Sequence, residues 1–232
     1  MIFPKFFADT SDINELKQVM GLGIFSGITT NPIIVAKQAG KTKPISYYEK
    51  IATAFPNIPV SISLLDNPIT ILIKQAEEYA SIAPNVIIKV PMYNDGRALP
   101  VIKELTSKGI KINATALMKK EQVLLSLLAG KNDKNFNPCY VSLFYGRIKD
   151  SGSDPINEIG RCRELIDKIS PATQIITGSI RDGAAVFEAI AAGAHIVTVP
   201  PKIIWEMIEH YKSTEFINQS QTEWNNYSKS NK

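Results

Sequence analysis

The sequence is poor in the residue types that most often hold metals or cross-links. Its 232 residues include two cysteines, Cys139 and Cys162, and two histidines, His195 and His210. The cysteines do not form a CxxC pair, so the pattern disfavours both a disulfide framework and a zinc site built from His and Cys. We therefore expect no metal and no cofactor.

Other signals are also missing. No apolar run approaches the roughly 18 residues of a membrane span, and the first ten residues lack the apolar core of a signal peptide. The sequence has no GxGxxG after a strand and no GxxxxGK[ST], which removes the usual nucleotide-binding interpretation. Scattered basic residues and a net charge of +4 indicate no nucleic-acid or membrane patch. We expect a cytoplasmic protein whose partner is an anionic small molecule.

Short β-rich runs alternate with helical patterns throughout the chain. The expected strands are residues 5–9, 27–30, 60–64, 86–91, 111–116, 140–144, 174–179 and 196–200. The expected helices are residues 12–20, 33–37 with 46–55, 69–81, 96–107, 119–128, 155–169, 182–191 and 202–211. Strands that alternate with helices predict parallel βαβ units, and eight such units favour a single α/β domain, a closed (β/α)8 TIM barrel, over a doubly wound sheet. We expect this catalytic barrel to span residues 1–212.

The remaining segment, residues 213–232, is polar with a few large apolar residues. Phe216, Ile217, Trp224 and Tyr227 fall on one face of a helix. We expect a C-terminal helix that packs on another subunit of a homo-oligomer, and a frayed tail is the alternative.

Lys89 is the most informative residue of the chain. It lies in the run VIIKVP, inside an otherwise apolar strand. Burial without compensation is costly for an ammonium group and favours the neutral amine, which is the nucleophile that forms Schiff bases with carbonyl compounds. The alternative is a lysine at a strand end that reaches solvent or pairs with a carboxylate.

Polar residues gather where the expected strands end. The set consists of Asp9, Thr29, Thr30, Asn31, Ser63, Lys89, Asn113, Thr115, Ser142, Arg147, Ser179 and Arg181. In a TIM barrel these positions meet at the rim that carries the active site. Each residue alone has an ordinary explanation, and Asp9 and Asn31 are both candidates for helix N-caps. Together a carboxylate, two amides, a lysine and two arginines suit proton transfer and anion capture.

Six segments in order, FFADT, GITTNP, NVIIKVP, INAT, YVSLFYGR and TGSIR, give the chain a specific resemblance. The later AAGAHIVTVPPK continues it, so that it covers nearly the whole chain. The sequence resembles the small transaldolase family that includes the bacterial fructose 6-phosphate aldolases. This resemblance implies a class I aldol mechanism on a (β/α)8 barrel, with the Schiff-base lysine on the fourth strand, where Lys89 falls.

The resemblance also implies roles for the other rim residues. Asp9 would exchange the proton of the hydroxyl at the cleaved bond. The segment of Thr30 and Asn31, together with Asn113, would bind the three-carbon dihydroxyacetone fragment. The resemblance places Arg147, Ser179 and Arg181 at the terminal phosphate, with Ser142 beside them, and guanidinium groups suit such an oxyanion.

Two positions depart from the family pattern. Ser63 stands where members usually carry a glutamate or glutamine that relays protons through a water, so Ser63 and Thr115 would have to hold that water. Phe144 stands where the aldolase branch places a tyrosine acid. Because phenylalanine has no proton to give, transfer of the fragment to an aldehyde acceptor should exceed its release as free dihydroxyacetone.

Three alternatives stay open. The resemblance extends to a sulfofructose transaldolase, which acts on 6-deoxy-6-sulfofructose and releases sulfolactaldehyde. Fructose 6-phosphate aldolase activity is the second alternative, and a catalytically silent sugar-phosphate-binding barrel is the third. A binding barrel would need the arginines but has no use for Lys89 beside Asp9.

Overall fold

The computed structural model describes residues 3–131 and 138–230. Its strands are β1 Lys5–Asp9, β2 Phe25–Thr29, β3 Val60–Ser63, β4 Val86–Pro91, β5 Ile112–Leu117, β6 Tyr140–Phe144, β7 Gln174–Gly178 and β8 Ile196–Val199. Its helices are α1 Ile13–Met20, α2 Pro32–Gln38, α3 Pro44–Ala54, α4 Ile69–Ala80, α5 Ala98–Ser107, α6 Lys120–Gly130, α7 Tyr145–Asp150, α8 Pro155–Ile169, α9 Gly183–Ala191, α10 Pro201–Ile208 and α11 Tyr211–Ser230. Each strand pairs in parallel with the next, and β8 pairs with β1, so the sheet closes into a barrel. The predicted (β/α)8 TIM barrel is confirmed.

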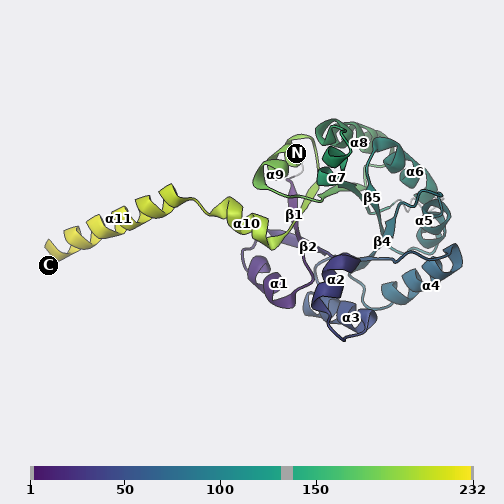
Figure 1. Cartoon of the computed structure of the whole chain (residues 1–232), viewed down its shortest axis with the longest axis horizontal. Coiled ribbons are helices and arrows are strands. Elements are labelled where there is room, and N and C mark those ends of the chain that lie inside the picture. The colour runs from purple at the N-terminus through teal and green to yellow at the C-terminus, as the bar shows by residue number, and fades with distance from the viewer. Residues whose placement is uncertain (1–2, 132–137, 231–232) are drawn as a thin grey trace.

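The helices form a ring around the sheet (Figure 1). Alternate residues of each strand face the helices and the barrel interior. On β4, Ile88 and Val90 belong to the apolar core between the sheet and the helices. Lys89, which lies between them, therefore faces the barrel interior.

Below the polar residues at the strand ends, the barrel interior is filled by apolar side chains. Phe7, Ile176 and Ile196 form a separate buried cluster against which Tyr140 packs. The Phe7 ring lies so close to β2 that a Cβ atom at Gly27 would come within 2.3 Å of it. The absence of a side chain at Gly27 therefore leaves room for the Phe7 ring. This plug closes the barrel below the polar residues at the strand ends, as expected for a packed TIM barrel.

Several elements begin or end a few residues from the predicted bounds, and two differences go further. Helix α7 follows β6 directly, and it is too short for apolar periodicity to reveal it. Tyr145, which directly follows the predicted strand 140–144, begins α7 and donates a hydrogen bond to Glu188. Tyr211, expected at the end of the preceding helix, begins α11, because α10 ends at Ile208.

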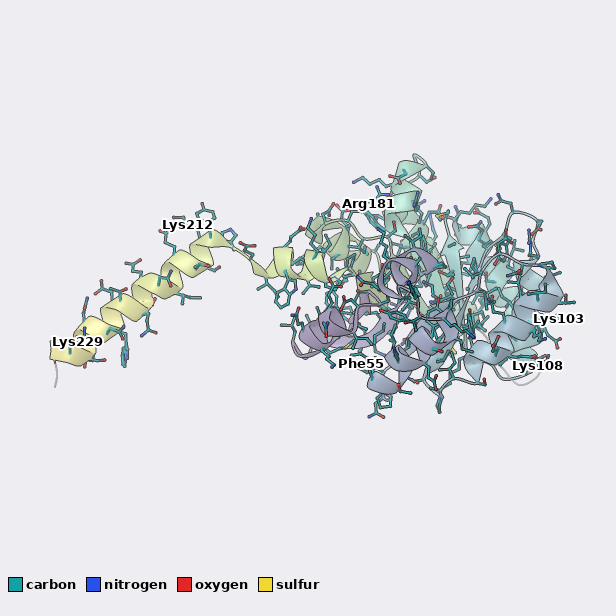
Figure 2. The ribbon with its side chains drawn as sticks, turned by 60° about the horizontal axis from the view of Figure 1, so that its bottom comes forward. Phe55, Lys103, Lys108, Arg181, Lys212 and Lys229 are labelled. Carbon is teal, nitrogen blue, oxygen red and sulfur yellow. The ribbon has the colours of Figure 1, made fainter. Side chains whose placement is uncertain are left out.

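Helix α11 extends away from the barrel (Figure 1). Lys212 and Lys229, near its two ends, both lie outside the barrel in the second view (Figure 2). None of its residues, all of which the structure describes, is buried. No helix in the described parts of the chain combines the length and the apolar character needed to cross a membrane.

Candidate active site

A cavity of about 400 Å³ opens at the carboxyl ends of the strands. It is lined by Asp9, Thr29, Asn31, Pro32, Ile33, Lys89, Ser142, Phe144, Arg147, Gly178, Ser179 and Thr198. The residues come from β1, β2, β4, β6, β7 and β8 or from the loops and helices that follow them. Most of the predicted rim residues are therefore brought together in one cavity.

Lys89 lines this cavity and is 6% exposed. Its Nζ donates a hydrogen bond to the backbone carbonyl of Thr30 at 2.7 Å. Burial lowers the pKa of Lys89, and the nearby charge of Asp9 opposes this effect. The arrangement favours a neutral amine at a lower pH than an ordinary lysine allows.

Asp9 ends β1 and lies in register with Thr29 on β2. Thr29 Oγ1 donates a hydrogen bond to Asp9 Oδ1 at 2.8 Å and lies 2.5 Å from Thr198 Oγ1. Burial raises the pKa of Asp9, while the charge of Lys89 and the hydrogen bond from Thr29 lower it. Asp9 is thus a carboxyl group with an increased proton affinity beside the lysine, which suits proton exchange.

Asn113 lies beside Lys89 in the sheet register, and its side chain is fully buried. Its Oδ1 accepts a hydrogen bond from Ser142 Oγ at 2.8 Å, whereas its Nδ2 has no partner among the described residues. Because buried polar atoms are almost always satisfied, this amide donor suits a hydrogen bond to a water or to a bound ligand.

Ser63 and Thr115, like Asn113, lie outside the lining of the cavity, and Thr115 is in register with Pro91 rather than with Lys89. Ser63 is in register with Lys89, and its Oγ donates to the carbonyl of Leu64 at 3.3 Å. Thr115 Oγ1 and Ser61 Oγ on β3 are both buried, and neither has a hydrogen-bond partner among the described residues. These hydroxyls and the small serines of β3 suit a buried water more than a bulky substrate.

The segment after β2 acts partly through its backbone. Thr30 is fully buried, and its side chain donates to the carbonyl of Ser61 at 2.9 Å, so its carbonyl is what reaches Lys89. Asn31 lines the cavity and also accepts from the Ile34 N–H at 2.9 Å, which makes it the N-cap of α2. The cap of α1 is Asp12 rather than Asp9.

The two arginines do not face the same cavity. Arg147, on α7, lines the first cavity, as does Phe144. Arg181 lines a second cavity of about 310 Å³, where it forms an ion pair with Asp150. Ser179 lines both cavities and adopts a left-handed backbone with φ of 58°. Such a conformation is uncommon for a residue other than glycine and is often found at functional sites.

Thr198 and Asp150 are not among the site residues predicted from the sequence. Thr198 lies within the apolar strand IVTV, where a threonine is an ordinary β-strand residue, and only closure of the barrel brings it to Thr29. Asp150 lies at the end of the unpredicted α7. No group of three or more potential metal-ligating side chains occurs within residues 3–131 and 138–230.

Comparisons with known proteins show which family the chain resembles. The profile of the Transaldolase/Fructose-6-phosphate aldolase family matches residues 6–231. A "Probable transaldolase" of Oceanobacillus iheyensis is 34% identical over 223 residues, which cover 95% of this chain and 98% of the relative. A "Probable transaldolase" of Geobacillus thermodenitrificans is 35% identical with the same coverage. "Probable transaldolase 1" of Bacillus anthracis is 34% identical over 222 residues, 95% of this chain and 97% of the relative.

Proposed function

The chain belongs to the Transaldolase/Fructose-6-phosphate aldolase family, and we propose that it transfers a dihydroxyacetone unit from fructose 6-phosphate to an aldehyde through a Schiff base on Lys89. The observation that carries the proposal is the buried pair of Lys89 and Asp9 in one cavity at the carboxyl ends of the barrel strands. A barrel that only binds sugar phosphates has no use for a desolvated amine beside a carboxyl group.

The proposed reaction begins when the neutral amine of Lys89 attacks the ketone carbon, C2, of the ketose. Loss of water from the carbinolamine gives an iminium. Asp9 takes the proton of the C4 hydroxyl as the C3–C4 bond breaks, and the electron pair of that bond moves into the iminium to give an enamine. The released aldehyde leaves, and the three-carbon fragment stays bound to Lys89.

An acceptor aldehyde then reacts with the enamine, and Asp9 returns its proton to the new hydroxyl. Water hydrolyses the iminium and frees Lys89. A water near Ser63 and Thr115 is the proton carrier that we propose for imine formation, in place of the missing third-strand carboxylate. The amide donor of Asn113, which has no partner among the described residues, and Asn31 in the cavity lining would hold the hydroxyls of the fragment while the acceptor enters.

Phe144 lines the cavity and cannot protonate the enamine. The candidate hydroxyl next to it, Tyr145, is buried and engaged with Glu188, and its pKa is raised to about 12, first by burial. We therefore propose that transfer to an acceptor exceeds release of free dihydroxyacetone, which favours a transaldolase over a fructose 6-phosphate aldolase.

The anionic end of the substrate is assigned to Arg147 and Ser179 in the first cavity. A sulfofructose transaldolase is the second candidate function. The placement of Arg181 in the second cavity favours it, because a single arginine suits a sulfonate with one charge better than a phosphate with nearly two.

The test is a side-by-side turnover assay with fructose 6-phosphate, sulfofructose and fructose, each with an aldose acceptor. We expect the anionic ketoses to react far faster than fructose, and Arg147→Lys to remove much of that preference because the bidentate fork is lost. Dihydroxyacetone is measured in parallel and should remain a minor product. If the enzyme turns over neither fructose 6-phosphate nor sulfofructose, the proposal is contradicted.

We further propose that the enzyme is a homo-oligomer held in part by α11. Phe216, Ile217 and Trp224 are between 63% and 70% exposed on this helix. With Tyr227 they fall in an arc of about 100° at 3.6 residues per turn. An apolar stripe of this kind usually marks a protein contact.

A further inference from the structure

Arg181 has contacts on two sides. Its Nη1 and Nη2 donate to Asp150 Oδ1 at 2.7 Å and Oδ2 at 2.5 Å, a bidentate ion pair. A Cβ atom at Gly146 would lie 2.7 Å from the Arg181 Nε, so the guanidinium end packs directly on the Gly146 backbone. Arg181 is labelled on the barrel in Figure 2, far from α11.

Asp150 is the carboxylate that holds this arginine. The other two carboxylates at the second cavity have different partners, since Asp182 accepts from the Ala185 N–H and Glu188 accepts from the Tyr145 hydroxyl. The hydrogen bond from Arg181 lowers the pKa of Asp150, and the charges of Arg181 and Arg147 add to this. Asp150 is thus ionised at neutral pH.

The two cavities share a wall. Ser179 lines both, and its carbonyl accepts a hydrogen bond from the Gly146 N–H at 3.1 Å. Arg147, three residues before Asp150 on α7, lines the first cavity. A reorientation of the Arg181 side chain past Ser179 would therefore bring a second guanidinium to the anion end of the first cavity.

We propose that Asp150 is a specificity-determining residue that withholds Arg181 from the substrate's terminal anion. With the pair intact, Arg147 alone faces the anion, and a phosphate must compete with the Asp150 carboxylate to recruit Arg181. The exchange is feasible because an arginine fork binds phosphate and carboxylate in the same bidentate manner, and an exposed ion pair is weak. Both partners are about half exposed. This inference rests on the proposed function and names the residue that sets its anion preference.

The first test compares kcat/KM for fructose 6-phosphate and for fructose with one aldose acceptor. Asp150→Asn removes the charge and keeps the shape, and Asp150→Ser is a second variant in case the first does not fold. We expect the preference for the phosphorylated ketose to rise by about three- to tenfold through a lower KM, the size of a weak surface ion pair. In the double variant Asp150→Asn with Arg181→Gln the gain should disappear.

Asp167→Asn is the matched control. Asp167 accepts two hydrogen bonds from Arg163 Nε at 2.9 and 2.8 Å on α8, away from both cavities, and it loses the same charge. An equal gain in this control would mean that net charge alone acts on the substrate. An unchanged or lower preference in Asp150→Asn, or a gain that survives Arg181→Gln, would overturn the proposal.

A second readout separates this proposal from the proposed function. The affinity for inorganic phosphate is measured from the rise of the unfolding midpoint with phosphate concentration, which requires no turnover. Asp150→Asn should bind phosphate about three- to tenfold more tightly than the parent chain. If the parent chain turns over no ketose, the proposed function fails and this measurement still decides the role of Asp150, because equal affinities would overturn it.

Discussion

Thr29 has a single hydroxyl hydrogen, and the site fixes where it points. An ionised Asp9 can only accept, so Thr29 donates to it, and the short contact with Thr198 then requires Thr198 to donate to Thr29. Thr198 therefore donates to Thr29, and Thr29 donates to the Asp9 carboxylate. The hydrogen bond from Thr29 offsets part of the increase in the pKa of Asp9 that burial causes.

The role of Asp9 can be separated from imine formation. Asp9→Asn preserves the shape and a hydrogen bond with Thr29 but cannot accept the C4 hydroxyl proton. We expect turnover to fall by about 10²–10⁴-fold, the usual contribution of a positioned acid–base group, while borohydride still traps much of the ketose on the protein. Equal losses of trapping and turnover would instead make Asp9 a structural residue.

The pH dependence of trapping should report the coupling between Lys89 and Asp9. Because burial lowers the pKa of Lys89, the trapping rate should rise with pH and reach its midpoint below the roughly 10.4 of a free lysine. The charge of Asp9 favours the ammonium form, so Asp9→Asn should move the midpoint to a still lower pH. Single-turnover rates over a pH series measure this, and a midpoint that rises in the variant would contradict the assigned coupling.

At the scale of elements, the strands were easier to foresee than the short helix after β6. The run VIIKVP and the strands 5–9 and 140–144 have the predicted bounds, because short β-branched runs between turns are a strong local signal. Helix α7 has six residues, too few to show an apolar period, and it follows β6 without a turn. The sequence therefore indicated two arginines near the rim, but not that Arg181 would pair with Asp150 in a second cavity.

A substitution on strand β2 tests how tightly the barrel interior is packed. Gly27→Ala would place a methyl group against the Phe7 ring in the closed plug, and we expect overpacking to reduce the free energy of unfolding by about 1–3 kcal/mol. Ser26→Ala on the same strand is exposed and should change it by less than about 0.5 kcal/mol. Urea denaturation followed by circular dichroism measures both. Equal effects would mean that the Phe7 ring moves aside readily.

At the scale of the whole molecule, α11 is the part that the barrel leaves without support. A helix of 20 residues spans about 30 Å, and an isolated, largely polar helix of this length is only marginally stable in water. The apolar stripe was visible in the sequence, because periodicity is local. The surface proposed to cover the stripe was not visible, because it would belong to another subunit.

Removal of α11 tests the proposed assembly. A chain that ends at His210 should keep its barrel and contain fewer subunits, as measured by light scattering, than the full chain. Ile217→Ser with Trp224→Ser should shift the mass in the same direction, because these changes remove apolar contact area. Gln219→Ser with Gln221→Ser is the control and should leave the mass unchanged. An unchanged number of subunits in the truncated chain would rule the idea out.

The proposed mechanism depends most directly on which lysine carries the substrate. The measurement is borohydride reduction in the presence of fructose 6-phosphate, followed by intact mass and peptide mapping, on the parent chain, Lys89→Ala and Lys89→Arg. Lys111→Ala is the control, since the Lys111 Nζ donates to the Pro84 carbonyl and does not line the cavity. We predict one adduct on the Lys89 peptide in the parent and in the control, and none in the two Lys89 variants, because arginine stays protonated and forms no such imine. An adduct on another lysine, or one that persists in Lys89→Ala, would contradict the account.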